Sequence, residues 1–201
     1  MSQALSHQFA DRYGYSAYLV RKKVFHLLGG AFEIFDPQGN VILYSKMKAF
    51  KLKEDIRLYT GEDMRTELMT IKARQALDFS AAYDVVDSIT GEKVGALRRK
   101  GLKSMFKDEW VILDGYENEI GLIQEESAFL ALLRRFVTNL IPQTFNVQIG
   151  GVPVSTFKQN FNPFVTKLSL DFSPDAQQRL DRRLGLAAAI LLCAIEGKEN
   201  G

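Results

Sequence analysis

The sequence predicts a mainly β protein: a closed antiparallel barrel of about twelve strands that encloses an apolar α-helix near the end of the chain. The first observation is a regular succession of short apolar or alternating segments from Tyr18 to Leu170, each bounded by turn residues. The second is the run Leu184–Ile195, which is apolar in every direction on a helix and must therefore be surrounded. The third is that composition stays even, so we expect one domain over residues 1–201, with 1–14 as a candidate flexible segment.

Hairpins recur along the chain. The segment Ala31–Phe35 leads into the turn Asp36–Asn40 and returns as Val41–Met47. Segments 54–59 and 67–74 alternate charged and apolar residues, which gives a strand one dry face and one wet face. The other expected strands have strand length and turn residues at their ends. They are Tyr18–Phe25, Ala82–Asp87, Val94–Arg99, Trp110–Leu113, Ile120–Ile123, Thr144–Ile149, Val152–Thr156 and Phe164–Leu170.

The apolar helix supplies the filling that a barrel of this width needs. Ser173-Pro174-Asp175 has the pattern of a helix start, with a capping hydroxyl, a proline at the first position and an acid in the first turn. We therefore expect a central helix over residues 173–196, with a stop at Gly197. Its apolar run is shorter than the roughly 20 residues of a bilayer-spanning helix, so no transmembrane segment is expected. Cys193 lies within the run and is interpreted as a core residue.

Two shorter helical segments are expected. Ser127–Phe136 has apolar residues at helical spacing, a serine cap and arginines in its last turn. Gln3–Asp11 is a candidate for a short N-terminal turn.

The sequence offers little for catalysis or cofactor binding. His7, His26 and one cysteine do not have the spacing of a metal site, and no phosphate-cradling glycine motif is present, so we expect no metal, no cofactor and no enzyme. The acidic pairs Asp84/Asp87 and Glu125/Glu126 are interpreted as solvated surface. The net charge of +2 implies no particular partner, and the absence of a signal segment favours the cytoplasm.

Three clusters of cations are candidate binding surfaces. The main one runs from Arg98 to Lys107 and includes Leu102, Met105 and Phe106. Cations beside exposable apolar side chains suit an anionic membrane surface. The candidate headgroup-binding residues are Arg98, Arg99, Lys100, Lys103 and Lys107. The other two clusters are Lys46, Lys48, Lys51 and Lys53, and the run Arg21–Lys23. The alternative is that all these charges only solubilise the outside of a barrel.

The prediction is a non-catalytic binding module that associates with anionic phospholipid headgroups at a membrane surface, from the cytoplasmic side. The alternative is a scaffold or regulatory protein that binds another macromolecule, with no lipid role. A nucleic acid is the weaker partner of that kind, because aromatic residues do not alternate with the cations.

The chain also resembles the tubby-like superfold and, within it, the phospholipid-scramblase and LURP-one-related branch. The resemblance covers Tyr18 to Glu196 and is carried by Val24-Phe25, the Phe32–Tyr44 hairpin with its Asp36–Asn40 turn, and the close Phe164–Ile195. It implies a barrel threaded by the terminal helix. Scramblases are similar but carry an acidic calcium-binding segment before that helix. Residues 160–171 contain a single carboxylate here, Asp171, so calcium dependence is not carried over.

Overall fold

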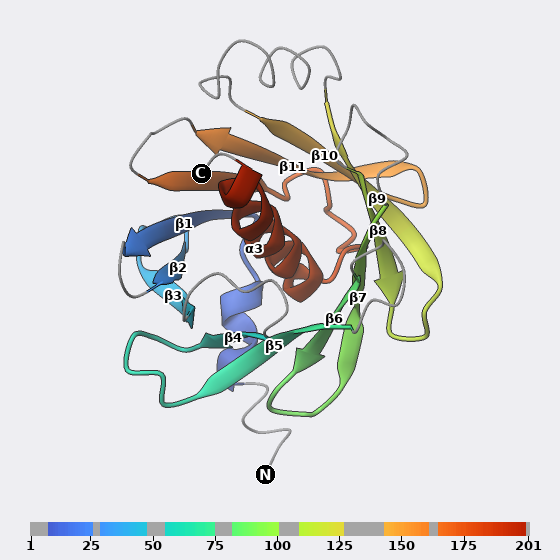
Figure 1. Ribbon diagram of the computed structural model, residues 1–201. Coiled ribbons are helices and arrows are strands. Elements are labelled where there is room, and N and C mark those ends of the chain that lie inside the picture. Colours follow the sequence, from blue (N-terminus) through green and yellow to red (C-terminus); the bar gives the residue numbers. More distant parts are fainter. Residues whose placement is uncertain are drawn as a thin grey trace.

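Within residues 8–25, 29–47, 55–74, 82–100, 109–126, 143–160 and 165–199, which the computed structural model describes, twelve antiparallel strands form a closed barrel (Figure 1). The strands are β1 (Ala17–Phe25), β2 (Gly29–Phe35), β3 (Val41–Met47), β4 (Ile56–Tyr59), β5 (Glu67–Ala73), β6 (Ala82–Asp87), β7 (Lys93–Arg99), β8 (Glu109–Asp114), β9 (Glu119–Glu125), β10 (Thr144–Ile149), β11 (Val152–Asn160) and β12 (Thr166–Asp171). Each strand pairs with its neighbours in sequence, and β1 closes the ring by pairing with both β2 and β12. The predicted class and strand number are confirmed.

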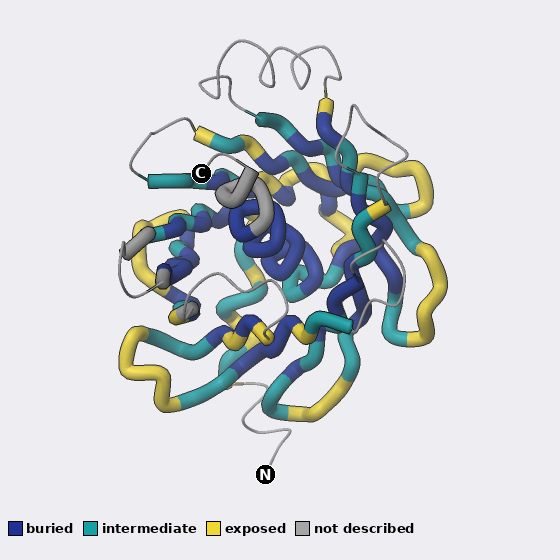
Figure 2. Tube along the Cα trace, in the orientation of Figure 1, coloured by how far each residue is buried: buried dark blue, intermediate teal, exposed yellow. Residues whose placement is uncertain are grey.

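The hairpin between β2 and β3 shows how local sequence sets these turns. The Asp36 carboxylate accepts hydrogen bonds from the backbone N–H and the side-chain amide of Asn40, at 2.8 and 2.9 Å. Gly39 has a φ of +86°, a conformation that side chains rarely adopt. The same geometry recurs after β8, where the carboxylate of Asp114 binds Asn118. These turns are exposed, and the strands between them carry the buried residues (Figure 2).

Helix α3 (Arg182–Glu199) is seen within the ring of strands (Figure 1). Its side chains from Leu184 and from Leu186 to Ala194 are buried, Cys193 among them, and they share one hydrophobic cluster with inward-facing strand residues. Among the described residues, α3 contacts β7 and β12 most, then β1 and β6. Buried Lys22 of β1 donates to the carbonyl of Cys193 at 3.0 Å, which ties the wall to the later turns of the helix.

The expected start of this helix at Ser173 is wrong. Residues 173–181 form turns, and Gln178 has a φ of +50°, which an α-helix does not allow. The carboxylate of Asp175 accepts from the N–H groups of Arg179 and Leu180, so it organises the loop instead of capping a helix. The cap is Asp181, whose Oδ1 accepts from the N–H of Arg183 at 2.8 Å. The helix also passes the expected stop and continues to Glu199.

The chain before β1 packs against the same core. Residues 8–10 are helical and lead into the 3₁₀ turn η1 (Asp11–Tyr13), so the described part of the expected N-terminal turn is helical. Phe9 and Tyr13 contact the main hydrophobic cluster, and Arg12 donates to the carbonyl of Thr60 at 3.1 Å. The expected helix Ser127–Phe136 lies outside the described residues.

Helix α3 packs closely against the ring of Phe172 at Gly185. A Cβ at this position would lie 2.7 Å from Cζ of Phe172, whose ring is held by Tyr18, Phe157 and Arg182. We expect Gly185→Ala to lower the free energy of unfolding by about 1–2 kcal/mol in urea titration, although alanine favours a helix, because the crowded ring cannot give way. In a Phe172→Leu background the same change should be neutral or stabilising. A more stable Gly185→Ala single variant would show that the ring moves freely.

Candidate functional site

On β1, side chains alternate between the barrel interior and its outer surface. Tyr18, Val20 and Lys22 are buried, whereas Leu19 and Arg21 are only partly buried and face outward. Lys23 follows the outward row. Inward and outward residues alternate in this way because successive side chains on a strand point to opposite faces.

The strand register gathers cations from distant parts of the sequence beside this outward row. Lys167 of β12 pairs with Arg21, and Lys158 of β11 pairs with Ser169 of β12. On the other side, Ala31 of β2 lies between Lys23 and Lys46 of β3. We call the outer surface of these five strands the basic face. Its outward cations are Arg21, Lys23, Lys46, Lys158 and Lys167, and the acids on these strands are Glu33 and Asp171.

Glu33 is the acid that pairs with two cations of the basic face. Its side chain is only 2% exposed and forms ion pairs with both Arg21 and Lys23. Burial raises the pKa of this carboxyl, but the hydrogen bonds and charges of Lys23 and Arg21 outweigh it, and the net pKa is lowered. The Arg21 guanidinium also lies over the ring of Phe35, 4.7 Å from its centroid. One carboxylate thus holds two cations, and the cluster keeps a net positive charge.

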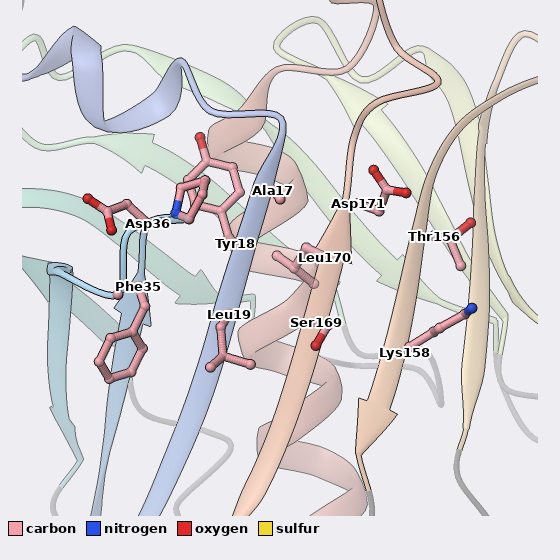
Figure 3. A pocket seen from close by; sticks show the side chains of 12 residues that line it. Ala17, Tyr18, Leu19, Phe35, Asp36, Thr156, Lys158, Ser169, Leu170 and Asp171 are labelled. Atoms are coloured by element: carbon pink, nitrogen blue, oxygen red, sulfur yellow. The ribbon is translucent and has the colours of Figure 1, made fainter.

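A groove of about 580 Å³ opens on the outer surface of β1, β12 and β11 (Figure 3). Small side chains in the middle strands, Ala17 and Ser169, leave the space. Leu19, Phe35 and Pro37 give one side an apolar lining. The other side is polar and carries Thr156, Lys158, Ser169 and Asp171.

Both acids that line the groove stay ionised near neutral pH. Hydrogen bonds from Asn40 hold the pKa of Asp36 below its ordinary value. Hydrogen bonds from Ser173 lower the pKa of Asp171, and the charge of Lys158 adds to this effect. Neither carboxyl therefore has the raised pKa that suits a general acid near neutral pH.

The residues predicted to bind headgroups lie elsewhere. Arg98 of β7 forms an ion pair with Glu119, and Lys100, just after β7, forms one with Glu109. Arg99 ends β7. In the strand order, β7 is across the ring from β1, so this cluster does not join the basic face. Lys103 and Lys107 lie outside the described residues.

The sequence identified part of the basic face and missed the rest. It singled out Arg21–Lys23 and Lys46 as two separate clusters, and the register brings them together. Lys22, however, points inward, and Lys48, Lys51 and Lys53 lie outside the described residues. Lys158 and Lys167 were assigned no role from the sequence. Their alternation with apolar residues could have shown that they face outward, but not that β12 pairs with β1.

Two of the four acids that were expected at the solvated surface are buried instead. Asp87 is buried and binds Arg183 of α3 at 2.8 Å, and Glu125 is buried as well, so neither is solvated surface.

The described residues contain no group of three side chains suited to hold a metal ion. Nor does any helix in the described ranges combine the length and hydropathy that crossing a membrane requires.

Comparison with known proteins places the chain in a family. The LURP-one-related family model matches residues 16–193. A comparison with curated proteins gives no match. A solved structure of an Arabidopsis thaliana protein is similar with a TM-score of 0.48 and 13% identity, over 94% of this chain and 96% of that one. The family match spans the barrel from just before β1 into α3, and the chain belongs to the LURP-one-related family.

Proposed function

We propose that this protein is a non-catalytic binding module whose basic face associates with anionic phospholipid headgroups at a membrane surface. The observation that carries the proposal is the charge balance of that face: five outward cations against the two acids of its five adjacent strands and Asp36 of the β2–β3 turn, which lines the groove. Near an anionic bilayer each lysine or arginine contributes about 1 kcal/mol of attraction. The apolar side of the groove lies within the same face and offers contact to the less polar part of a lipid.

Two features favour this face over the Arg98–Lys107 cluster. Lys158 and Lys167 form no ion pair among the described residues, so their charges are available to a ligand. Arg98 and Lys100 each already have a carboxylate partner, and a headgroup would have to compete with it. The non-catalytic part of the proposal is supported by the family and by the lowered pKa values of the two groove carboxyls.

The proposal is tested by sedimentation with vesicles of phosphatidylcholine, with and without phosphatidylserine. We expect the protein to be retained on the anionic vesicles only and to be released as salt is raised, because exposed charges are screened. In the Lys158→Ala/Lys167→Ala variant retention should weaken by about thirtyfold, since two attractive charges are lost. The matched control is Arg65→Ala/Lys72→Ala, which removes the same charge from the outer surface around β4 and β5 and should change retention by less than about threefold.

Other outcomes would point elsewhere. Loss of retention in Arg98→Ala/Lys100→Ala, with the basic-face variant unaffected, would assign the binding to the cluster beyond β7. Equal retention on neutral and anionic vesicles would reject the lipid role. A salt-resistant protein partner in a pull-down, without vesicle retention, would favour a scaffold.

A further inference from the structure

The outward side chains of β12 change sign along the strand. Lys167, Ser169 and Asp171 follow one another on the outer surface, in the order positive, neutral, negative. Lys158 lies opposite Ser169 on the neighbouring strand β11. The hydroxyl of Ser169 is therefore flanked by two lysines, and the carboxylate of Asp171 lies one step further along the same row. This order is complementary to a short ligand with an anionic and a cationic end.

The charged groups in this row remain open to a ligand. The Lys158 ammonium stands clear of the Asp171 carboxylate (Figure 3). Lys158 and Lys167 make no ion pair within the described ranges. The Oδ1 atom of Asp171 accepts from the N–H of Ser173 at 2.9 Å, but a carboxylate has about four acceptor positions, so capacity remains.

The rest of the groove fits a small ligand end better than a large surface. Ala17 and Ser169 leave the hollow, and Thr156 adds a second hydroxyl next to Lys158 on β11. Leu19 and Phe35 line the opposite side together with Asp36, whose carboxylate already accepts two hydrogen bonds from Asn40 (Figure 3). Hydroxyl and ammonium donors on one side suit phosphate oxygens, and the apolar side suits the carbon chain that joins the two charged ends.

We propose that this groove binds an aminoethyl phosphate group, with the phosphate over Ser169 beside Lys158 and the ammonium on Asp171. Lys167, which precedes Ser169 in the outward row, lies beyond the groove lining and adds positive charge at the phosphate end. The group is found both in free phosphoethanolamine and in amine-bearing phospholipid headgroups. The inference rests on the proposed function, because it names which headgroups the basic face prefers. A charge-only surface would bind any anion of equal charge, whereas this groove discriminates through Asp171.

The first test uses soluble ligands, so that it does not depend on membrane binding. In two-dimensional NMR titrations of the full chain, phosphoethanolamine should bind about tenfold more tightly than inorganic phosphate, because Asp171 adds one charge-assisted hydrogen bond. Phosphocholine should lose most of that gain, since its quaternary ammonium has no N–H to donate. The shifted amides should belong to β11, β12 and the β2–β3 turn. Equal affinities for phosphoethanolamine and inorganic phosphate would overturn the inference.

Variants separate the two ends of the ligand. Asp171→Asn should abolish the preference for phosphoethanolamine over inorganic phosphate. Phosphate itself should bind at least as tightly as before, because a nearby negative charge is removed and asparagine can still accept from Ser173. Lys158→Ala should weaken both ligands about equally. A preference that survives Asp171→Asn would mean that the amine is recognised elsewhere.

The second test distinguishes the membrane source from the free one. Phosphatidylcholine vesicles receive equal shares of either phosphatidylserine or phosphatidylglycerol, which have the same net charge but differ in the amine. The inference predicts stronger retention on phosphatidylserine, and free phosphoethanolamine should compete with it. Equal retention on both vesicles would overturn the amine preference and leave the proposed function standing. Retention on neither, with phosphoethanolamine still bound in solution, would overturn the membrane role and leave the groove as a site for the free ligand.

Discussion

Replacing Ala188 with aspartate is expected to prevent the chain from folding. Ala188 is 3% exposed in α3, and Ala187 and Ala189 beside it are fully buried. A carboxylate placed there would lose its hydration among the apolar side chains of the main hydrophobic cluster. The cost should exceed about 4 kcal/mol, well above that of an ordinary point change. The measurement is the yield of folded protein and, where any is recovered, its urea unfolding followed by circular dichroism.

Two companion variants show that charge and burial cause the effect. In Ala188→Asn the new side chain has nearly the shape of aspartate but no charge, so this variant should lower the free energy of unfolding clearly less than Ala188→Asp. Gln177→Asp adds the same charge at an exposed position in the loop before α3, and should change stability by less than about 0.5 kcal/mol. A soluble Ala188→Asp protein that melts cooperatively would contradict the idea that the barrel wall surrounds this helix with apolar side chains.

The barrel itself could be predicted because its signals are local. The Asp36–Asn40 turn specifies a hairpin through its own carboxylate and a glycine of positive φ, and similar chemistry recurs after β8. Alternation within a strand then fixes which side chains face inward. A meander of hairpins leaves few choices of strand order, so counting turns gave the correct architecture.

The candidate site was harder to predict from the sequence, because its residues come together only when the first and last strands of the barrel pair. Lys158 and Lys167 join Arg21 only through the pairing of β12 with β1, which links the two ends of the meander. No local pattern encodes that register. The Arg98–Lys107 cluster stood out in the sequence because its cations are close together in the chain, yet Arg98 pairs with Glu119 of β9 and Lys100 pairs with Glu109 of β8. A run of cations in the sequence therefore does not show that their charges are free to bind a ligand, because in a barrel acidic residues from other strands can pair with them.

The start of α3 was misplaced for a different reason. Ser173-Pro174-Asp175 has the residues of a helix start, but Asp175 is drawn into a buried contact with Arg182, seven residues further on. Its carboxylate, 1% exposed, accepts from Arg182 at 2.7 Å in addition to the two loop N–H groups, and Arg182 lies over the ring of Phe172. The loop is therefore held by tertiary contacts that a local pattern cannot reveal.

Replacing Asp175 with asparagine is expected to lower the free energy of unfolding by about 3 kcal/mol at neutral pH, because Arg182, 11% exposed, would be left without its counter-charge. Urea titration measures the change. Adding Arg182→Met should restore part of the loss, since it removes the unpaired cation. The control is the exposed pair of Asp63 and Arg65, where Asp63→Asn should cost less than about 0.5 kcal/mol.

The destabilisation by Asp175→Asn should also depend on pH. Burial raises the pKa of Asp175, but the hydrogen bonds from Arg182, Arg179 and Leu180 outweigh it, and the folded pKa lies below the ordinary value of 3.8. The stabilisation by the carboxylate is therefore fully present above that value and is lost as pH falls through the folded pKa. The difference between the wild-type protein and Asp175→Asn should be constant from neutral pH down to about pH 5 and should shrink only in stronger acid. A difference that stays the same down to the acid unfolding of both proteins would mean that Asp175 contributes through its shape and not through its charge.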